Sequence, residues 1–204
     1  MTRGSRSKEK FSLKGRVVFF ATGNIHKFNE VRSILTKLDI AVGMLRVKDS
    51  EIQSDSLMEI AQTSVRDAFK RCHMPVIVED AGLFIDALNG FPGPYAAYVY
   101  KTIGNKGLLT LMENVEDKKA LFQSAIAYCD NISCTPVCFK GEAKGEITTN
   151  ERVGSGKSGF GFDPIFQPSG SLKTFAEMTL EEKNGFSHRT SAICKFAKWF
   201  KGLK

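Results

Sequence analysis

Residues 16–38 contain the feature that most restricts the fold: an apolar strand that runs directly into a glycine turn and then into a helix. The segment RVVFFATGN, residues 16–24, is apolar on both sides of the chain, which is typical of a strand buried on both faces. The residues after it place Phe28, Val31 and Leu35 at helical spacing. A strand–turn–helix unit of this kind predicts an α/β fold, in which helices cover a sheet.

The turn at the end of this strand, ATGNIHKF, has the groups that a phosphate needs. Asn24 can cap the helix, Gly23 lets the backbone approach an anion, and Lys27 lies in the first helical turn. Free N–H groups, the helix dipole and one ammonium would then converge on a phosphate. A capped turn with a surface lysine explains the same residues, so this segment alone leaves both interpretations open.

The remaining patterns predict strands and helices whose order changes along the chain. Residues 40–47 and 75–88 are strand-like, and the second segment is expected to break at an acidic pair and a glycine. The capping box Ser56-x-x-Glu59 begins a helix that ends near Arg71. Later segments are expected to form a turn and a short helix at 90–104, a helix at 106–114, antiparallel strands at 120–130 and 135–147, and helices that begin at Thr179 and Ser187.

These elements predict an α/β fold, a three-layer mixed twisted sheet flanked by helices. We expect a single domain at residues 16–204, preceded by a basic, disordered tail at residues 1–15. No apolar run approaches the roughly 20 residues that span a bilayer, so we expect a cytoplasmic protein with no membrane partner. The Arg/Ser-rich start leaves a transit peptide as the alternative.

The positive charge of the chain is concentrated at one end. The formal net charge is +7, but residues 1–16 hold six Lys/Arg and one Glu, which leaves only +2 for the body. A basic arm on a nearly neutral body does not favour a nucleic-acid partner. Five cysteines without a C-x-x-C pair favour reduced thiols over a zinc site or a disulfide framework.

Residues 153–166, VGSGKSGFGFDPIF, contain two phosphate-binding signatures at once. Their glycines fit the dinucleotide pattern G-x-G-x-x-G, and GKS matches the end of a Walker A loop. Both signatures need a helix directly after the glycines, but Pro164 and Pro168 prevent one. Glu151 also replaces the first Walker glycine. The segment therefore predicts an aromatic loop, not a phosphate-binding helix.

Two adjacent acids, Glu79 and Asp80, lie at the end of an apolar strand-like segment. Burying a carboxylate there is costly unless a cation pairs with it. Neighbouring strand side chains point to opposite faces, so one carboxylate is expected in the crevice and the other in a structural role. We assign Asp80 as the Mg²⁺ ligand and water activator, with Mn²⁺ as the alternative ion. Magnesium favours a second carboxylate, for which Glu51 is the candidate.

A cationic group lies at the entry of the last helix, in TLEEKNGFSHRTSA. Lys183, His188 and Arg189 could form a second clamp for an anion or for the edge of a base. Taken singly, these residues are as well explained by surface or capping positions.

Six motifs in register carry a resemblance to a known family. They are TGNIHK, EIQ, VEDAGL, GFPGPY, FGFDPIF, and KTFAEMTLEEKN followed by SHR, within residues 16–200. In these motifs the chain resembles the inosine triphosphate pyrophosphatases, most closely the archaeal and eukaryotic type. The resemblance implies hydrolysis of ITP, dITP and XTP to the monophosphate and pyrophosphate, dependence on Mg²⁺, and a homodimer.

The resemblance also implies roles for particular residues. Asp80 and Glu51 match the metal carboxylates of the family, Asp80 its general base, and Lys27 a catalytic lysine. The aromatic loop would hold the base, while the first turn meets the phosphates. The residues expected to bind substrate are Thr22, Gly23, Asn24, Ile25, His26, Lys27, Ala81, Phe160, Gly161, Phe162, Asp163, Lys183, His188 and Arg189.

Three departures from the family pattern concern affinity more than reaction class. Phe162 stands where relatives often have Tyr or Trp, which keeps a stacking face but loses a polar handle. SHRTSA lacks the basic residue of S-H-R-G-K-A, and PYAAYVY lacks the arginine of Y-S-A-R-Y.

Three other functions remain as alternatives. A P-loop NTPase would release or transfer orthophosphate, not pyrophosphate. A nucleic-acid-binding module would use the basic tail and the 16 Phe residues. A relative of the pyrophosphatases could also bind nucleotide without turning it over.

Overall fold

The computed structural model describes residues 16–46, 52–131, 133, 135–154 and 159–203. Glu51 and the basic tail lie outside this part of the chain. The described strands are β1 (Arg16–Ala21), β2 (Ile40–Leu45), β3 (Val76–Ile85), β4 (Pro92–Gly93), β5 (Lys119–Cys129), β6 (Val137–Ile147) and β7 (Phe166–Pro168). The described α-helices are α1 (Ile25–Lys37), α2 (Leu57–Cys72), α3 (Ala96–Thr102), α4 (Gly104–Leu111), α5 (Leu180–Asn184) and α6 (His188–Gly202).

The strands form one mixed sheet, as the sequence predicts. Its order is β2-β1-β3-β5-β6-β7, with β4 paired to β3. β1 pairs in parallel with β2 and with β3, because each intervening helix returns the chain to the end of the sheet at which the previous strand began. The pairs β3–β5, β5–β6 and β6–β7 are antiparallel, so the sheet changes type at β3.

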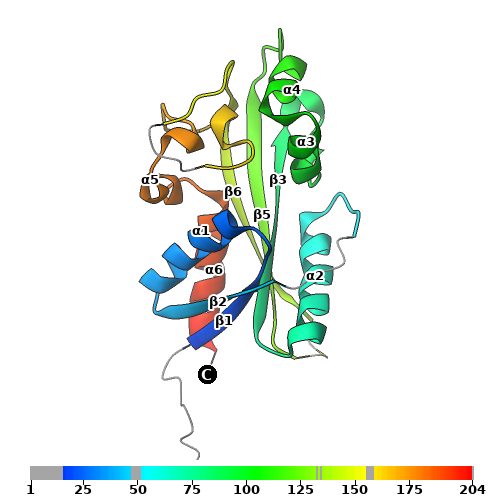
Figure 1. The fold of residues 1–204 in the computed structure, drawn as a ribbon, viewed down its shortest axis with the longest axis vertical. Coiled ribbons are helices and arrows are strands. Elements are labelled where there is room, and N and C mark those ends of the chain that lie inside the picture. Colours follow the sequence, from blue (N-terminus) through cyan, green and yellow to red (C-terminus); the bar gives the residue numbers. More distant parts are fainter. Residues whose placement is uncertain (1–15, 47–51, 132, 134, 155–158, 204) are drawn as a thin grey trace, which may run out of the picture.

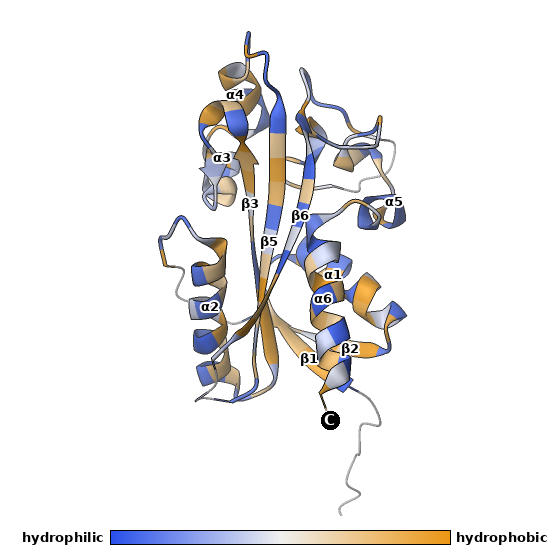
Figure 2. Cartoon of the chain, turned by 180° about the vertical axis from the view of Figure 1, so that it is seen from behind, coloured by the Kyte–Doolittle hydropathy of each residue, from blue (hydrophilic) through white to orange (hydrophobic). Residues whose placement is uncertain are grey.

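Helices cover both faces of the sheet and make three layers (Figure 1). α1 and α6 pack on one face around Phe20, Val31 and Phe196, and α2 packs on the other around Val65 and Val78. These contacts follow from the two-residue period of the strands, which sends alternate apolar side chains to opposite faces. Figure 2 shows hydrophobic residues concentrated along the strands and hydrophilic residues along α2.

The molecule has two lobes that share the long strands (Figure 1). The lower lobe comprises β1, β2, α1, α2 and α6. The upper lobe comprises the far ends of β3, β5 and β6, together with α3, α4 and the described residues from 148 to 184. Its core includes Leu83, Leu108, Phe166 and Phe175, all fully buried. The three strands that pass through both lobes fix the cleft between them.

The expectation that β3 breaks at the acidic pair and glycine is wrong. The strand runs without interruption to Ile85, and its partner β5 follows it over the whole length. Neutralising partners make the buried carboxylate of Glu79 compatible with a strand. Gly82 has a packing role: a Cβ there would lie 2.5 Å from the carbonyl oxygen of Gly93 in the paired β4.

The helix starts agree closely with the capping signals. Thr179 and Glu182 form a complete capping box at α5, and Ser187 caps α6. Ser56 caps α2 by accepting from the N–H of Glu59, but the carboxylate of Glu59 accepts from the hydroxyl of Ser54 and not from the N–H of Ser56, so the predicted capping box is only half formed. Within the described residues, no helix has the length and apolar character that crossing a membrane requires.

Candidate active site

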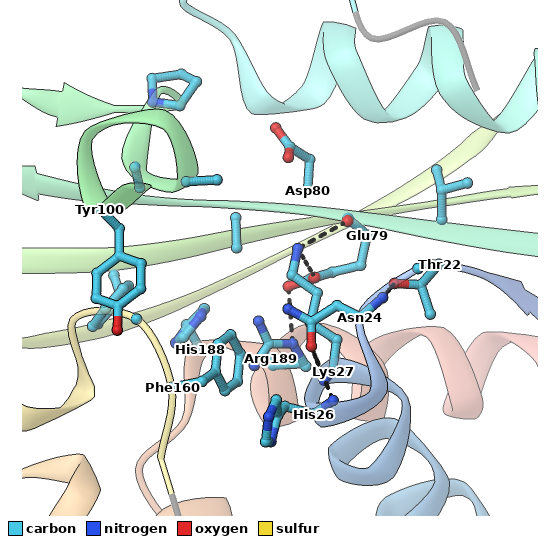
Figure 3. A pocket seen from close by; sticks show the side chains of 18 of the residues that line it. Thr22, Asn24, His26, Lys27, Glu79, Asp80, Tyr100, Phe160, His188 and Arg189 are labelled. Carbon is cyan, nitrogen blue, oxygen red and sulfur yellow. Dashed lines mark hydrogen bonds and ion pairs between the residues drawn. The ribbon is translucent and has the colours of Figure 1, made fainter. Parts of the chain in front are cut away.

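A pocket of about 760 Å³ lies between the two lobes. Its floor comes from the β1–α1 turn, one wall from the middle of β3 and from α2, and its far end from α3, the aromatic loop and the start of α6 (Figure 3). The lining side chains that matter below are Thr22, Asn24, His26, Lys27, Glu79, Asp80, Tyr100, Phe122, Phe160, Phe162, Asp163, His188 and Arg189. Segments from all parts of the sequence thus meet at one cavity.

The β1–α1 turn is a capped helix start that faces the pocket. The side chain of Asn24 accepts hydrogen bonds from the N–H groups of His26 and Lys27, at 2.9 and 3.2 Å, which confirms the predicted cap. The hydroxyl of Thr22 accepts from the N–H of Asn24 at 3.1 Å. Gly23 lines the pocket and has no atom within 4 Å of its missing Cβ, so its backbone is open to a ligand. Ile25 is 47% exposed and is not part of the pocket wall.

Glu79 and Asp80 point to opposite sides of β3, as the strand period predicts (Figure 3). The side chain of Glu79 is fully buried. Its oxygens lie 2.8 Å from Nζ of Lys27 and 3.1 Å from Nε of Arg189. Burial alone would raise the pKa of Glu79, but the charges of Arg189 and Lys27 outweigh it and hold that pKa well below its usual range.

Glu30 is a buried carboxylate in the same network that the sequence analysis did not single out. Its two oxygens bind Arg189 Nη1 and, at 2.7 Å, Lys183 Nζ. Burial opposes its ionisation, but the neighbouring Arg189 and Lys183 lower its pKa to about 2. The only sequence signal is its position three residues after Lys27, on the same side of α1.

Lys183 lies behind the pocket wall and is only 3% exposed. Its ammonium contacts both Glu30 and Asp163 at 2.7 Å and lies 5.0 Å from the centre of the Phe160 ring. Lys183 is therefore not among the lining residues of the pocket. Its contacts join Asp163 and the ring of Phe160, which both line the pocket, to Glu30 of α1.

The aromatic loop presents its two rings differently. Phe160 is partly exposed and stacks on His26 from the β1–α1 turn, with ring centres 5.4 Å apart. Phe162 is 3% exposed and packs edge-on against Tyr100 at 5.5 Å. Asp163 accepts a hydrogen bond from the N–H of Phe160 at 2.8 Å, which fixes the turn between the rings.

His188 adds a neutral polar group to the pocket. Its ring stacks on Phe122, with centres 4.8 Å apart and planes 10° from parallel. Burial and the charge of Arg189 lower the pKa of His188 well below its usual 6.5, so the imidazole is uncharged at neutral pH. Nδ1 of this buried ring has no hydrogen-bond partner in the described part of the chain.

The predicted metal carboxylates can be compared with the structure only in part. Asp80 and Ala81 line the pocket, and a carboxylate is the kind of oxygen donor that Mg²⁺ prefers. Glu51 lies outside the described residues. In the residues that are described, no group of three or more His, Cys, Asp or Glu side chains is arranged to hold a metal ion.

The segment with the two phosphate signatures is not followed by an α-helix. Residues 155–158, which include GKS, lie outside the described residues. After them the chain forms a single 3₁₀ turn at Asp163–Ile165 and then the short strand β7. The geometry that either phosphate signature requires is therefore missing from the described residues after the glycines.

Known proteins resemble this chain over nearly its whole length. A model of the Ham1 family matches residues 18–199. The chain is 51% identical to the dITP/XTP pyrophosphatase of Methanopyrus kandleri over 184 residues, which cover 90% of this chain and 96% of that protein. It is 46% identical to the protein of the same name from Thermococcus kodakarensis over 182 residues, 89% and 96% of the two chains.

Solved structures agree with the sequence matches. The structure of a HAM1 protein from Coxiella burnetii has a TM-score of 0.80 at 30% identity and covers 92% of this chain and all of that one. The Staphylococcus aureus Ham1 protein gives 0.78 at 30% identity, with 93% and 100% coverage. The resemblance carried by the six motifs is thereby confirmed, and the chain belongs to the Ham1 family.

Proposed function

We propose that this chain is a nucleoside triphosphate pyrophosphatase that converts ITP, dITP and XTP to the monophosphate and pyrophosphate. Such an enzyme removes deaminated purine nucleotides from the nucleotide pool. The observation that carries the proposal is that one pocket joins a capped helix start, with Lys27 in its first turn, and a carboxylate to an aromatic loop. Relatives named dITP/XTP pyrophosphatase, 43–51% identical, support the same substrates.

The phosphate end of the substrate is assigned to the β1–α1 turn. The dipole of α1, the open backbone at Gly23 and the ammonium of Lys27 favour an anion there. Glu79 holds the ammonium of Lys27 at 2.8 Å and so limits the positions it can take. Orientation of this kind lowers the barrier by bringing the reacting groups together before the reaction.

Asp80 is proposed to be the catalytic carboxylate and, with Glu51, the holder of Mg²⁺ or Mn²⁺. A bound divalent cation would neutralise phosphate charge and lower the pKa of water. Asp80 would orient a water molecule towards the α-phosphorus and accept its proton. Attack at that atom makes pyrophosphate the leaving group.

The base end is assigned to the aromatic loop and to His188. The partly exposed ring of Phe160 offers a stacking face, and stacking on a base contributes on the order of 1–3 kcal/mol. An uncharged imidazole with an unsatisfied buried nitrogen gains more from a base edge than from an apolar ligand. Selection for an oxo group would follow because a mismatched donor pair is costly when buried.

A homodimer and a cytoplasmic location are proposed with the activity. Light scattering of the purified protein should give twice the mass of one chain, and cell fractionation should recover the activity with the cytoplasm. A chain that is monomeric at micromolar concentration would contradict the first proposal.

The decisive experiment is the identity of the products on a small panel of nucleotides. With Mg²⁺, ITP, dITP and XTP should give the monophosphate and pyrophosphate, whereas ATP and GTP should react far more slowly. Orthophosphate as first product would favour a P-loop type reaction. Equal rates on ATP and ITP would retain the pyrophosphatase but exclude the selective role, and binding without product would indicate a nucleotide-binding relative.

A further inference from the structure

Ser64 is a buried serine of α2 whose hydroxyl makes no hydrogen bond in the described parts of the chain. It is 5% exposed and lines the pocket. A hydroxyl within a helix commonly donates to the carbonyl one turn earlier, as Thr110 does to Lys106, but Ser64 does not. Because a buried hydroxyl without a partner is costly, this group is suited to a partner inside the pocket.

The surroundings of Ser64 on α2 are otherwise apolar. It lies in the buried stripe of the helix beside Ala61 and Val65. The stripe packs against Val78 and Ala125 of the sheet. An apolar side chain would suit such a position better, and serine is a weaker helix former than alanine. Packing therefore does not explain the hydroxyl.

Asp80 lies on the side of the sheet that α2 covers. It shares a face of β3 with Val78, because side chains two residues apart on a strand point the same way. It is also opposite Ala125 in the register of β5. Figure 3 shows its carboxylate directed away from Glu79. Asp80 and Ser64 therefore face the same part of the pocket.

The two residues also lie at about the same height along the sheet. The end of α2 leads through a short turn into β3, so helix and strand run in opposite directions (Figure 1). Ser64 lies about 12 Å along the helix from its end at Cys72. Asp80 lies about 13 Å along the strand from its start at Val76. Helical side chains tilt towards the N-terminus of their helix, which here is the direction from Val78 to Asp80.

From this arrangement we propose that Ser64 is a positioning residue for the water molecule that Asp80 activates. The proposal rests on the proposed function. A water that donates one hydrogen to Asp80 can still rotate until its second hydrogen has an acceptor. The hydroxyl oxygen of Ser64 accepts that hydrogen and so turns a lone pair of the water towards the α-phosphorus.

The chemical step then uses the hydroxyl without changing it. The water oxygen forms a bond to the α-phosphorus and its proton passes to Asp80. The bond between the α-phosphorus and the bridging oxygen breaks, and pyrophosphate leaves with the electron pair. Ser64 keeps its own proton throughout, so its loss affects the rate of the step and not the binding of the nucleotide.

The test compares Ser64→Ala with Ser191→Ala. The first change removes the hydroxyl from the pocket, and the second removes the same group from a partly buried position on α6 outside the pocket. Release of pyrophosphate from ITP, with Mg²⁺ present, gives kcat and KM. Calorimetric titration gives the affinity for an ITP analogue with a methylene bridge between the α- and β-phosphorus, which is not hydrolysed there. Thermal melts report on the fold.

Ser64→Ala should lower kcat for ITP about tenfold, with KM and the dissociation constant of the analogue within about a factor of two. Its melting temperature should be equal or slightly higher, because alanine is the better helix former. Ser191→Ala should match the unmodified protein in kinetics and binding.

An unchanged kcat in Ser64→Ala would overturn the proposal. Weaker binding of the analogue would also overturn it, because the hydroxyl would then contact the nucleotide itself. A lower melting temperature together with a lower kcat would indicate a structural role instead. If the unmodified protein releases no pyrophosphate from ITP, the proposed function has failed, and the role of Ser64 fails with it.

Discussion

Phe160 and Phe162 are two residues apart, but their rings have different surroundings. Phe160 lies at the pocket surface against His26, whereas Phe162 is 3% exposed within the core of the upper lobe. Phe160→Ala should therefore raise KM for ITP about tenfold or more with little change in melting temperature, because it removes a stacking face. Phe162→Ala should instead lower the free energy of unfolding by about 3–5 kcal/mol, since it leaves a cavity.

Steady-state kinetics and thermal melts of the two variants separate these effects. Each variant serves as the control for the other, because both delete the same ring from the same loop. A higher KM in Phe162→Ala, with an unchanged melt, would assign the stacking role to the buried ring instead.

Asp80 is the single residue on which the chemical step is proposed to depend. Asp80→Asn keeps the shape of the side chain but removes the charge, so turnover should fall by far more than tenfold while nucleotide still binds. Calorimetric titration gives the binding constant, and pyrophosphate release gives kcat. Asp67→Asn, in α2 and outside the pocket, is the matched control. More than about a tenth of the original kcat, a barrier change under roughly 1.4 kcal/mol, would remove Asp80 from the mechanism.

Residues with local signals were the easier part of the site to predict. Gly23 is indicated by a turn after a strand, Asn24 by its position as a helix cap, and Asp80 by an acid within an apolar strand. Glu30 and Tyr100 have no such signal, because each looks like an ordinary helix residue until the fold places it beside distant groups. The burial of Lys183 was also beyond the sequence, since both of its carboxylate partners are distant along the chain: Asp163 by 20 residues and Glu30 by 153.

Two helix caps, one at the pocket and one away from it, allow the effect of a cap on stability to be distinguished from its effect on ligand binding. Asn24 caps α1 at the pocket, and Ser56 caps α2 through the N–H of Glu59. Replacing either by Ala should cost about 1 kcal/mol of stability. Only Asn24→Ala should also raise KM for ITP, because it alone changes the N–H groups at the proposed phosphate site. Melting curves and kinetics of both variants test this, and an equal effect on KM would argue against the site.

Strands and helices were predicted well wherever one period dominated. The apolar strand of β1 and the spacing in α1 reflect the faces that these elements bury, and β6 alternates between buried and exposed residues. The end of β3 was missed because an acidic pair and a glycine usually stop a strand. Here Lys27 and Arg189 neutralise Glu79, and Gly82 admits β4, so long-range partners override the local signal.

At the scale of the whole molecule, buried ion pairs connect the lobes. Lys183 and Asp163 come from the upper lobe, whereas Glu30 and Arg189 come from helices of the lower one. The pairs therefore couple the position of the aromatic loop to that of α1 and α6. The same pairs should make the stability of the folded chain depend on pH.

Glu30 contributes to the acid limb of that dependence, together with Glu79, whose pKa is also lowered by its cationic neighbours. The pKa of Glu30 falls from 4.5 to about 2 on folding, so its contribution is complete above 4.5 and is lost as the pH falls towards 2. The shift corresponds to stability on the order of 3 kcal/mol. His188 adds to the loss from about pH 6.5 downwards, because burial lowers its pKa and the unfolded chain takes up the proton more readily.

Denaturant unfolding at successive pH values should show both phases. In Glu30→Gln, stability at pH 7 should be lower and the decline below 4.5 smaller, while Glu181→Gln, 85% exposed at the surface, should keep the original profile. A Glu30→Gln profile parallel to the original one would show that this carboxylate does not hold the lobes together.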